Sequence, residues 1–359
     1  MTLSVPRRRV IVHSGEDDLL SAAHDRASRN GQADRIAALL TESSEGVKPY
    51  VVPSDTLSLE TAATLGIERA EDFFGGAVPL PFVGTKAVSH GLAFRGAKAP
   101  TGWNPDLGEA LAEMTLPGFT AFSVSDAREA GFRLLASGPV RLKDVHAVAG
   151  LGQTAVSTPA ELISALTAKD PEAIARHGLV LEENLMDHET LSVGSVQVGH
   201  RRVSYWGVQR TVVRPDGREV YGGSDLQAAA GGYEDLLTFD LPAPARIAVT
   251  LARAWEAAVF DAYPGVIASR RNYDVIFGAN SRGDRRAGVL EQSWRIGGAS
   301  GAEIAALEVF SKDRSAGLVR TSTMEIPSIE AQVPAHAVVY FRGVDERAGP
   351  LTKYAVVHP

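Results

Sequence analysis

Two acidic residues in the C-terminal half of the chain could bind a metal ion. Asp274 lies in the apolar run 273–277, and Glu291 directly follows the apolar pair 289–290. Both runs are typical of strands, and the polar segment 280–284 between them is typical of a turn. Two adjacent antiparallel strands would present both carboxylates on one face. A carboxylate pair beside a hard oxygen donor suits magnesium, which fills its other octahedral positions with water and phosphate oxygens.

Ser293 and Arg295 follow Glu291 at intervals of two residues. On a strand they would share its face, because residues i, i+2 and i+4 point the same way. Ser293 is then the expected third donor to the metal, and Arg295 would face a phosphate or a developing oxyanion. One structural alternative is that Arg295 only pairs with a carboxylate, such as Glu303, and braces the following helix. Another is an ordinary hairpin with solvated charges.

A lysine upstream ends another expected strand, 139–143, and precedes a loop of small residues. Lys143 offers a point charge, and the loop, which contains Gly150 and Gly152, offers backbone N–H groups that can approach a phosphate closely. Together they are a candidate phosphate clamp. The segment is not a Walker loop, because no Gly-Lys-Ser or Gly-Lys-Thr follows, and no Gly-x-Gly-x-x-Gly opens a helix.

Acidic residues also lie near the end of the apolar segment 177–185 and at the start of the next expected strand. Glu182 and Glu183 lie within the segment, and Glu189 begins the strand 189–193. Ordinary surface charge is the alternative interpretation of Glu182 and Glu189.

Polar residues on other expected strands could contact a substrate. Gln209 and Arg210 lie on the strand 203–213 and could contact a substrate carboxylate. Arg210 and Arg271 are the candidates for anion binding.

The order of these residues along the chain resembles the ATP-grasp superfamily, in particular its carboxylate–amine ligases. The order begins with Lys143 and its small-residue loop, followed by the acidic hinge at 182–185 and the later Glu189. Asp274 comes next, and the pattern Glu-x-polar-x-Arg at 291–295 ends the order. The segment 82–86 resembles the family's lysine at the start of a helix, which would be Lys86. The resemblance extends from residue 82 to about residue 310. As a whole, the chain most resembles an uncharacterised bacterial ATP-grasp-like family, so the resemblance implies a mechanism and not a substrate.

The resemblance implies which residues bind ATP. Lys86 and Lys143 would hold its phosphates, beside the loop glycines Gly150 and Gly152. In the adenine hinge, Glu182 would accept a hydrogen bond from the exocyclic amine. Leu185 would pack beneath the ring, and Glu189 would bind the ribose hydroxyls. The hinge peptide comprises Glu182, Glu183, Asn184 and Leu185.

The resemblance also implies a metal site and catalytic residues. Magnesium, or manganese in its place, would be bound by Asp274, Glu291 and Ser293. The expected catalytic residues are Arg295, Lys143 and Arg271. Two departures affect these roles. Family members usually carry asparagine where this chain has Ser293, so one metal would be held loosely. Ala147 and Ala149 stand where the phosphate loop commonly has glycines, which would stiffen or reshape the loop.

The implied fold is α/β, with an N-terminal Rossmann-like domain before two α+β lobes that clamp ATP. The expected domains are the N-terminal α/β domain 1–84, a first lobe 85–180, a second lobe with the metal site 181–310, and a β-rich tail 311–359. In the N-terminal domain, expected strands 10–13 and 50–53 alternate with helical periodicity over 16–40, which breaks near 30–31. Such alternation favours a parallel sheet. A further helix should begin behind Ser58 as its cap.

Composition limits the function classes. With 359 residues, the chain is long enough for about two or three domains with substantial cores. The net charge of −7 argues against a nucleic-acid surface. No apolar run reaches the ~18 residues that a membrane span requires. The absence of cysteine excludes disulfides, zinc–thiolate sites and thiol nucleophiles, and it fits a reducing cytoplasm.

The expected activity is activation of a carboxylate. ATP would convert the carboxylate to an acyl-phosphate, from which an amine or similar nucleophile displaces phosphate, and the protein would supply positioning and charge neutralisation. The expected partners are small-molecule carboxylate and amine substrates, with a homodimer left open. The alternatives are an ATP-grasp carboxylase or kinase of the biotin-carboxylase type, and a non-catalytic nucleotide-binding protein. Fold-level analogy does not identify the substrates.

Overall fold

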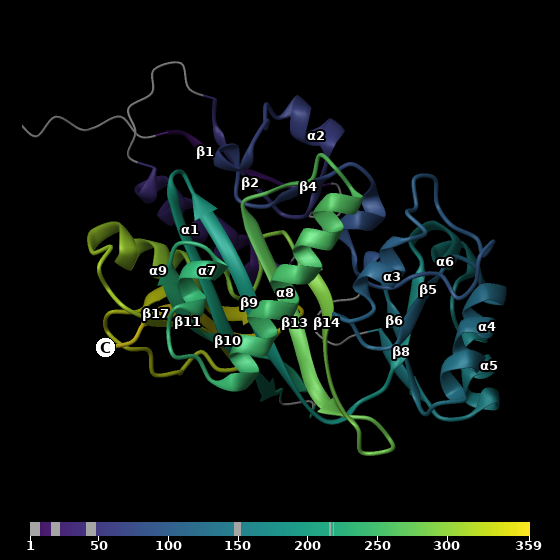
Figure 1. Cartoon of the computed structure of the whole chain (residues 1–359). Helices are drawn as coiled ribbons and strands as arrows, with labels where there is room; N and C mark the ends of the chain where they lie inside the picture. The colour runs from purple at the N-terminus through teal and green to yellow at the C-terminus, as the bar shows by residue number, and fades with distance from the viewer. Residues whose placement is uncertain (1–7, 16–21, 41–47, 147–151, 215–216, 218) are drawn as a thin grey trace, which may run out of the picture.

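The computed structural model describes residues 8–15, 22–40, 48–146, 152–214, 217 and 219–359. Figure 1 shows a long twisted sheet crossed by helix α8, with a smaller sheet and its helices α4, α5 and α6 beside it. The described strands form sheets of two, three, four and eight strands. We call the four-stranded one the small sheet and the eight-stranded one the large sheet.

The N-terminal residues form a parallel pair of strands, as the alternation of strand and helix predicted. β1 (Val10–His13) pairs in parallel with β2 (Tyr50–Pro53), and α1 (Ala23–Leu39) connects them. A three-stranded sheet adjoins this pair and consists of β3 (Leu57–Ser58), β4 (Gly76–Val78) and β12 (Ile267–Ala268). Helix α2 (Leu59–Thr64) begins behind Ser58, whose hydroxyl accepts a hydrogen bond from the Thr61 N–H, so the predicted serine cap is confirmed.

Helix α1 corrects one prediction, because it continues through Asn30 and Gly31 without a break. A Cβ atom on Gly31 would lie 2.8 Å from Cδ1 of Tyr340. The glycine is therefore explained by close packing against a C-terminal strand, and not by the helix break that its type suggested.

The small sheet is antiparallel throughout, with the strand order β5-β8-β6-β7. Its strands are β5 (Gly118–Ala121), β6 (Val140–Asp144), β7 (Gln153–Val156) and β8 (Leu179–Glu183). Its helices are α4 (Val124–Leu135), α5 (Pro159–Thr167) and α6 (Pro171–His177). Alanine, valine and leucine side chains from both layers form its core. Short helices precede it along the chain, namely η2 (Ala70–Asp72), η3 (Pro81–Gly84), η4 (Lys86–Ser89) and α3 (Leu107–Leu111).

The large sheet is also antiparallel and has the order β14-β13-β9-β10-β11-β15-β17-β16. Its strands are β9 (Met186–Val198), β10 (Arg201–Val213), β11 (Glu219–Ala230), β13 (Arg270–Ala279), β14 (Arg285–Ser293), β15 (Val319–Ile326), β16 (Val338–Asp345) and β17 (Gly349–Val357). Within the segment 311–359, which the sequence predicted to be β-rich, β16 and β17 pair as an antiparallel hairpin. Because β15 pairs with β11, the sheet continues past residue 310. The division into four domains stays a prediction.

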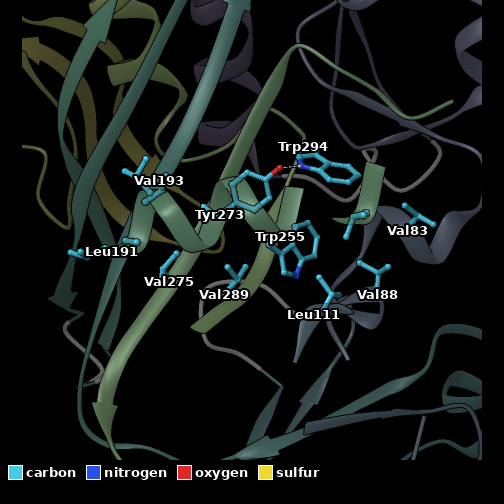
Figure 2. Close-up of a cluster of buried hydrophobic side chains, with 14 of the residues drawn as sticks. Val83, Val88, Leu111, Leu191, Val193, Trp255, Tyr273, Val275, Val289 and Trp294 are labelled. Atoms are coloured by element: carbon cyan, nitrogen blue, oxygen red, sulfur yellow. Dashed lines mark hydrogen bonds between the residues drawn. The ribbon is translucent and has the colours of Figure 1, made fainter. Parts of the chain in front are cut away.

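Helices cover both faces of the large sheet. On one face lie α7 (Tyr233–Leu237) and α8 (Ala243–Ala262), where Trp255 packs against Tyr273 and Trp294, as Figure 2 shows. On the other face lies α9 (Ser300–Lys312), whose Ile304 and Leu307 join a core with strands β9 and β10. Alternation along β13 therefore assigns Tyr273 to the α8 face and its two neighbours in sequence to the α9 face. No helix in the described part of the chain is long and apolar enough to cross a membrane.

Candidate active site

The predicted hairpin is confirmed, and it brings the two expected metal ligands face to face. Asp274 on β13 lies directly opposite Glu291 on β14, and Asn272 lies opposite Ser293. Lys86, at the start of η4 along the β14 edge, places its Nζ 2.6 Å from Oε2 of Glu291. The Lys86 side chain is buried. The lysine expected to bind phosphates therefore adjoins the carboxylate pair.

The two facing carboxylates disfavour each other's charge. Burial and then the neighbouring Glu291 raise the pKa of Asp274 to about 7, although a hydrogen bond from Gln209 and the charges of Lys143 and Lys86 lower it. The Gln209 Nε2 donates to Oδ1 of Asp274 at 2.8 Å. A cation placed between the carboxylates would remove this repulsion.

A second buried group forms on the small sheet around Glu182. Its Oε1 accepts a hydrogen bond of 2.9 Å from Lys143 Nζ, and its Oε2 lies 3.3 Å from His90 Nε2. Burial would raise the pKa of Glu182, but the charge of Lys143 and the contact with His90 lower it to about 2. Surface charge is therefore the wrong interpretation of Glu182. Its carboxylate is engaged by Lys143 and His90, and the adenine role of Glu182 stays a prediction.

The expected hinge peptide connects the small sheet to the large one. The backbone N–H groups of Glu183 and Asn184 donate to Pro117 and Pro139. The Glu183 carboxylate accepts from Asn280 and Arg286, at 3.0 and 3.1 Å. The Asn184 side-chain oxygen accepts from Arg141 at 2.6 Å.

A small apolar cluster lies beside the hinge peptide and consists of Leu116, Leu185, Ile276 and Leu290. Leu290 directly precedes Glu291, and Ile276 lies two residues after Asp274.

The other expected nucleotide-binding residues lie at strand ends. Glu189 is exposed on β9, opposite Phe277, so surface charge describes its environment. Gly152 precedes β7 with a φ of 64°, a conformation that favours glycine, and its carbonyl accepts from the Asp144 N–H. Gly150 lies outside the described residues. The ribose and phosphate roles of these residues stay predictions.

Arg295 lies just beyond β14, at the boundary with the N-terminal strands. Its Nε is 3.9 Å from Oδ1 of Asp55, and its Nη1 donates to the Ile296 carbonyl at 3.1 Å. Burial lowers the pKa of Arg295, while Asp55 raises it. The side chain is 33% exposed, so the guanidinium is not enclosed in a structural ion pair.

The structure corrects the structural alternative for Arg295, because the partner of Glu303 is Arg270. The Arg270 guanidinium forms two hydrogen bonds with Glu303, at 2.9 and 2.8 Å. Its Nη1 also donates to the carbonyl and hydroxyl oxygens of Ser293, at 3.0 and 3.2 Å. Arg270 braces the end of β14 against α9, which is the role that the sequence offered to Arg295.

The expected anion-binding role of Arg271 is also corrected. Its side chain points to the α8 face, opposite to Asp274, because adjacent residues of a strand alternate. There it donates to Glu256 at 2.7 Å, and Tyr273 donates to the same carboxylate at 2.8 Å. Arg210 likewise has a partner, since it pairs with Asp225. Of these candidates, Gln209 is the one that reaches the acid pair.

Three residues near the site, Asn272, Arg270 and His90, were not identified from the sequence. Asn272 and Arg270 lie two and four residues before Asp274 on its strand face, so alternation followed backwards would have found both. His90 directly follows η4, in the irregular segment that precedes α3. No sequence signal identified it.

The donor set around Asp274 and Glu291 fits magnesium. Among the described residues, no group of three or more His, Cys, Asp or Glu side chains could enclose a metal ion. Magnesium needs no such enclosure, because it commonly takes one or two carboxylates together with substrate phosphates and water. An all-protein cage for zinc or calcium would need more ligands than this pair.

Solved structures show a similar fold. The biotin carboxylase domain of 2-oxoglutarate carboxylase from Hydrogenobacter thermophilus, in complex with MgADP, ADP and bicarbonate, is 13% identical with a TM-score of 0.52, and the match covers 98% of this chain and 81% of that one. N5-carboxyaminoimidazole synthase from Aspergillus clavatus, in complex with ADP and 5-aminoimidazole ribonucleotide, is 13% identical with a TM-score of 0.50, and the match covers 98% and 94%. At this identity the likeness shows the fold, which is the expected α/β ATP-grasp fold.

Sequence comparison adds the family. No curated protein matches the chain. The family model described as "Protein of unknown function (DUF3182)" matches residues 11–355, so the chain belongs to this family.

Proposed function

We propose that the chain is an ATP- and magnesium-dependent ligase that activates a carboxylate as an acyl-phosphate for attack by an amine or similar nucleophile. The observation that carries this proposal is the contact of Lys86 with the facing pair Asp274 and Glu291. Lys143, whose charge also acts on Asp274, lies on the adjacent small sheet. Two lysines and two carboxylates at the junction of two sheets suit a metal–triphosphate complex.

Each group would make a distinct contribution to phosphoryl transfer. Lys86 and Lys143 would bind phosphate oxygens as point charges, and Asp274 and Glu291 would hold magnesium, which supplies charge neutralisation at the phosphates. Glu291 would exchange its contact with Lys86 for the metal. Phosphoryl transfer depends mainly on positioning and charge stabilisation, so the absence of a nucleophile or catalytic histidine among the assigned residues is consistent with it.

Arg295 would act at the acceptor end of the site. It lies beyond Ser293 and near Asp55, which follows β2, so it lies between the metal strands and the N-terminal strands. There a guanidinium could form paired hydrogen bonds with the transferred phosphoryl group or with the carboxylate that receives it. The acid–amine specificity would then depend on residues of the N-terminal part.

Carboxylation is the second candidate, because one similar structure is a biotin carboxylase domain that holds bicarbonate, and the other is named as a carboxyaminoimidazole synthase. In that reaction bicarbonate would be the carboxylate that receives the phosphoryl group. The same residues would bind ATP and magnesium in either case. The two candidates therefore differ in the acceptor alone.

The test is release of ADP and phosphate from magnesium–ATP in the presence of a panel of small carboxylic acids, each with and without amino acids or other amines. A separate arm contains bicarbonate with the amines alone. Release that requires both an organic acid and an amine supports the ligase, and release that requires bicarbonate supports the carboxylase. Asp274→Asn should abolish release, whereas Asp261→Asn, the same change at an exposed position of α8, should not. Failure of the native chain to bind magnesium–ATP would contradict both candidates.

A further inference from the structure

We infer that Asn272, and not Ser293, supplies the third protein oxygen to the metal held by Asp274 and Glu291. This inference rests on the proposed function and concerns the same site. It arises from the hydrogen-bond network behind the β13–β14 hairpin, which engages the serine and leaves the asparagine oxygen available.

Ser293 is held by a buried cation. The Nη1 of Arg270 lies 3.2 Å from the Ser293 hydroxyl oxygen and 3.0 Å from its carbonyl oxygen. Arg270 is 1% exposed, and its other nitrogens are fixed by two hydrogen bonds to Glu303. The hydroxyl would therefore have to ligate magnesium while it accepts from a guanidinium, and the two positive charges would repel each other.

The same network sets the orientation of the Asn272 amide. Tyr205 has one hydroxyl proton, which it donates to Oε1 of Glu303 at 2.5 Å. The Tyr205 oxygen can then only accept, so the group 3.0 Å from it on Asn272 must be the Nδ2 donor. Nδ2 also donates to the Ser192 hydroxyl at 2.7 Å. Both amide protons are thereby engaged, and Arg270, which donates hydrogen bonds to both oxygens of Glu303, fixes the direction of the hydrogen bonds in this network.

The Asn272 oxygen is left available by this arrangement. Within the described residues, the Asn272 side chain makes hydrogen bonds through Nδ2 alone. The Asn272 Oδ1 has no hydrogen-bond partner among the described residues, and it is not fully buried. It is therefore accessible to solvent. An amide oxygen is a hard, neutral donor of the kind that magnesium accepts.

The position of Asn272 matches that of a third ligand. It lies two residues from Asp274 on the same strand face and directly opposite Ser293, which itself lies two residues from Glu291. Directly opposed side chains on antiparallel strands have Cβ atoms about 4.5–5.5 Å apart. An amide at position 272 can therefore reach the region that a side chain at position 293 would serve. Asn272 on β13 would thus take the place of the asparagine that the family usually carries at position 293 on β14.

The test uses Mn²⁺ as the metal probe and ADP as the nucleotide, with free Mn²⁺ measured by electron paramagnetic resonance. We expect Asn272→Ala to weaken Mn²⁺ binding about tenfold or more, while the matched cross-strand variant Ser293→Ala changes it by less than about twofold. Metal-free ADP binding, measured in parallel, should be the same in both variants. Native Mn²⁺ affinity in Asn272→Ala would overturn the inference while leaving the proposed function intact.

A second measurement avoids variants that fold poorly. Native protein with ¹³C-labelled asparagine should show coupling between bound Mn²⁺ and a ligated amide carbon by electron–nuclear double resonance. The side-chain oxygens of Asn104, Asn184 and Asn280 are engaged by other donors, and Asn30 lies on α1, so the signal is attributed to Asn272. Mn²⁺ bound without such coupling would overturn the inference. No Mn²⁺ binding by the native chain with ADP would overturn the proposed function as well.

Discussion

Lys143 and Glu182 form a buried ion pair between the strands β6 and β8, with Nζ 2.9 Å from Oε1 and each side chain 3% exposed. The pair links the lysine expected to bind phosphates to the start of the hinge peptide. A buried pair of this kind is costly to break by removal of one partner, because the other is left as an uncompensated charge. Substitutions at either residue should therefore affect both ligand binding and stability.

Lys143→Ala should weaken binding of magnesium–ATP, as measured by calorimetry. Loss of a charged hydrogen bond to a phosphate corresponds to about 1.5–3 kcal/mol, or roughly 10–100-fold in affinity. Lys169→Ala is the matched control, because Lys169 forms a more exposed ion pair with Asp144 on the same small sheet. Unchanged affinity in folded Lys143→Ala would remove the phosphate role.

Glu182→Gln should reduce stability in a pH-dependent way. The folded state holds the pKa of Glu182 at about 2, below its ordinary value of 4.5. A depressed carboxyl pKa contributes stability that is fully present above the unfolded pKa and is lost as pH falls through the folded pKa. Denaturant unfolding should thus show a native-to-variant difference of about 3–5 kcal/mol near neutral pH. That difference should shrink between about pH 4.5 and pH 2, and a difference independent of pH would argue against ionised Glu182.

Local patterns allowed the hairpin and the acid pair to be predicted, whereas the overall fold was expected from the resemblance to the ATP-grasp superfamily. The hairpin followed from two apolar runs and a polar turn, and its register places Asp274 opposite Glu291. Strand alternation alone put Ser293 on the face of Glu291. These features depend on neighbours in sequence, and such information is present in a single chain.

Contacts between distant segments were not predictable in the same way. Glu303 has Arg270 and not Arg295 as its partner, because the choice depends on how α9 packs on the sheet. Gly31 suggested a helix break, although its neighbour is a tyrosine more than 300 residues away, Tyr340. The error at Arg271 was avoidable, since alternation from Asp274 already assigned it to the opposite face.

Asp274→Asn and Glu291→Gln should each abolish turnover while the fold remains intact. A neutral amide does not balance the charge of magnesium against the triphosphate. In the metal-free protein, Asp274→Asn should keep or raise the melting temperature, because it removes a desolvated carboxylate that faces Glu291. Thermal unfolding with a chelator present measures this effect. A large decrease in melting temperature for Asp274→Asn would show that the pair stabilises the fold instead.

Arg271→Ala should destabilise the protein without weakening nucleotide binding. Its guanidinium and Glu256 are both largely buried on the α8 face, so truncation leaves a carboxylate with only tyrosine hydroxyl donors, from Tyr273 and Tyr233. We expect a loss of about 1–3 kcal/mol in the free energy of unfolding. Affinity for magnesium–ATP, measured below the unfolding transition, should stay at the native value. A selective loss of ATP affinity with native stability would restore the anion-binding role of Arg271.

Arg295→Lys is expected to lower kcat about 10²–10³-fold, the usual effect of removing one preorganised donor to developing charge. A lysine keeps the charge but cannot form the paired hydrogen bonds of a guanidinium. Binding of ATP should change little, because the lysines and the hinge hold it, so the substitution should separate kcat from the KM for ATP. The bracing role belongs to Arg270, which forms the ion pair with Glu303. Arg295→Lys should therefore leave the melting temperature unchanged, whereas Arg270→Lys should lower it. If Arg295→Lys instead lowered the melting temperature and left kcat intact, its contact with Asp55 would be structural, and its catalytic assignment would be wrong.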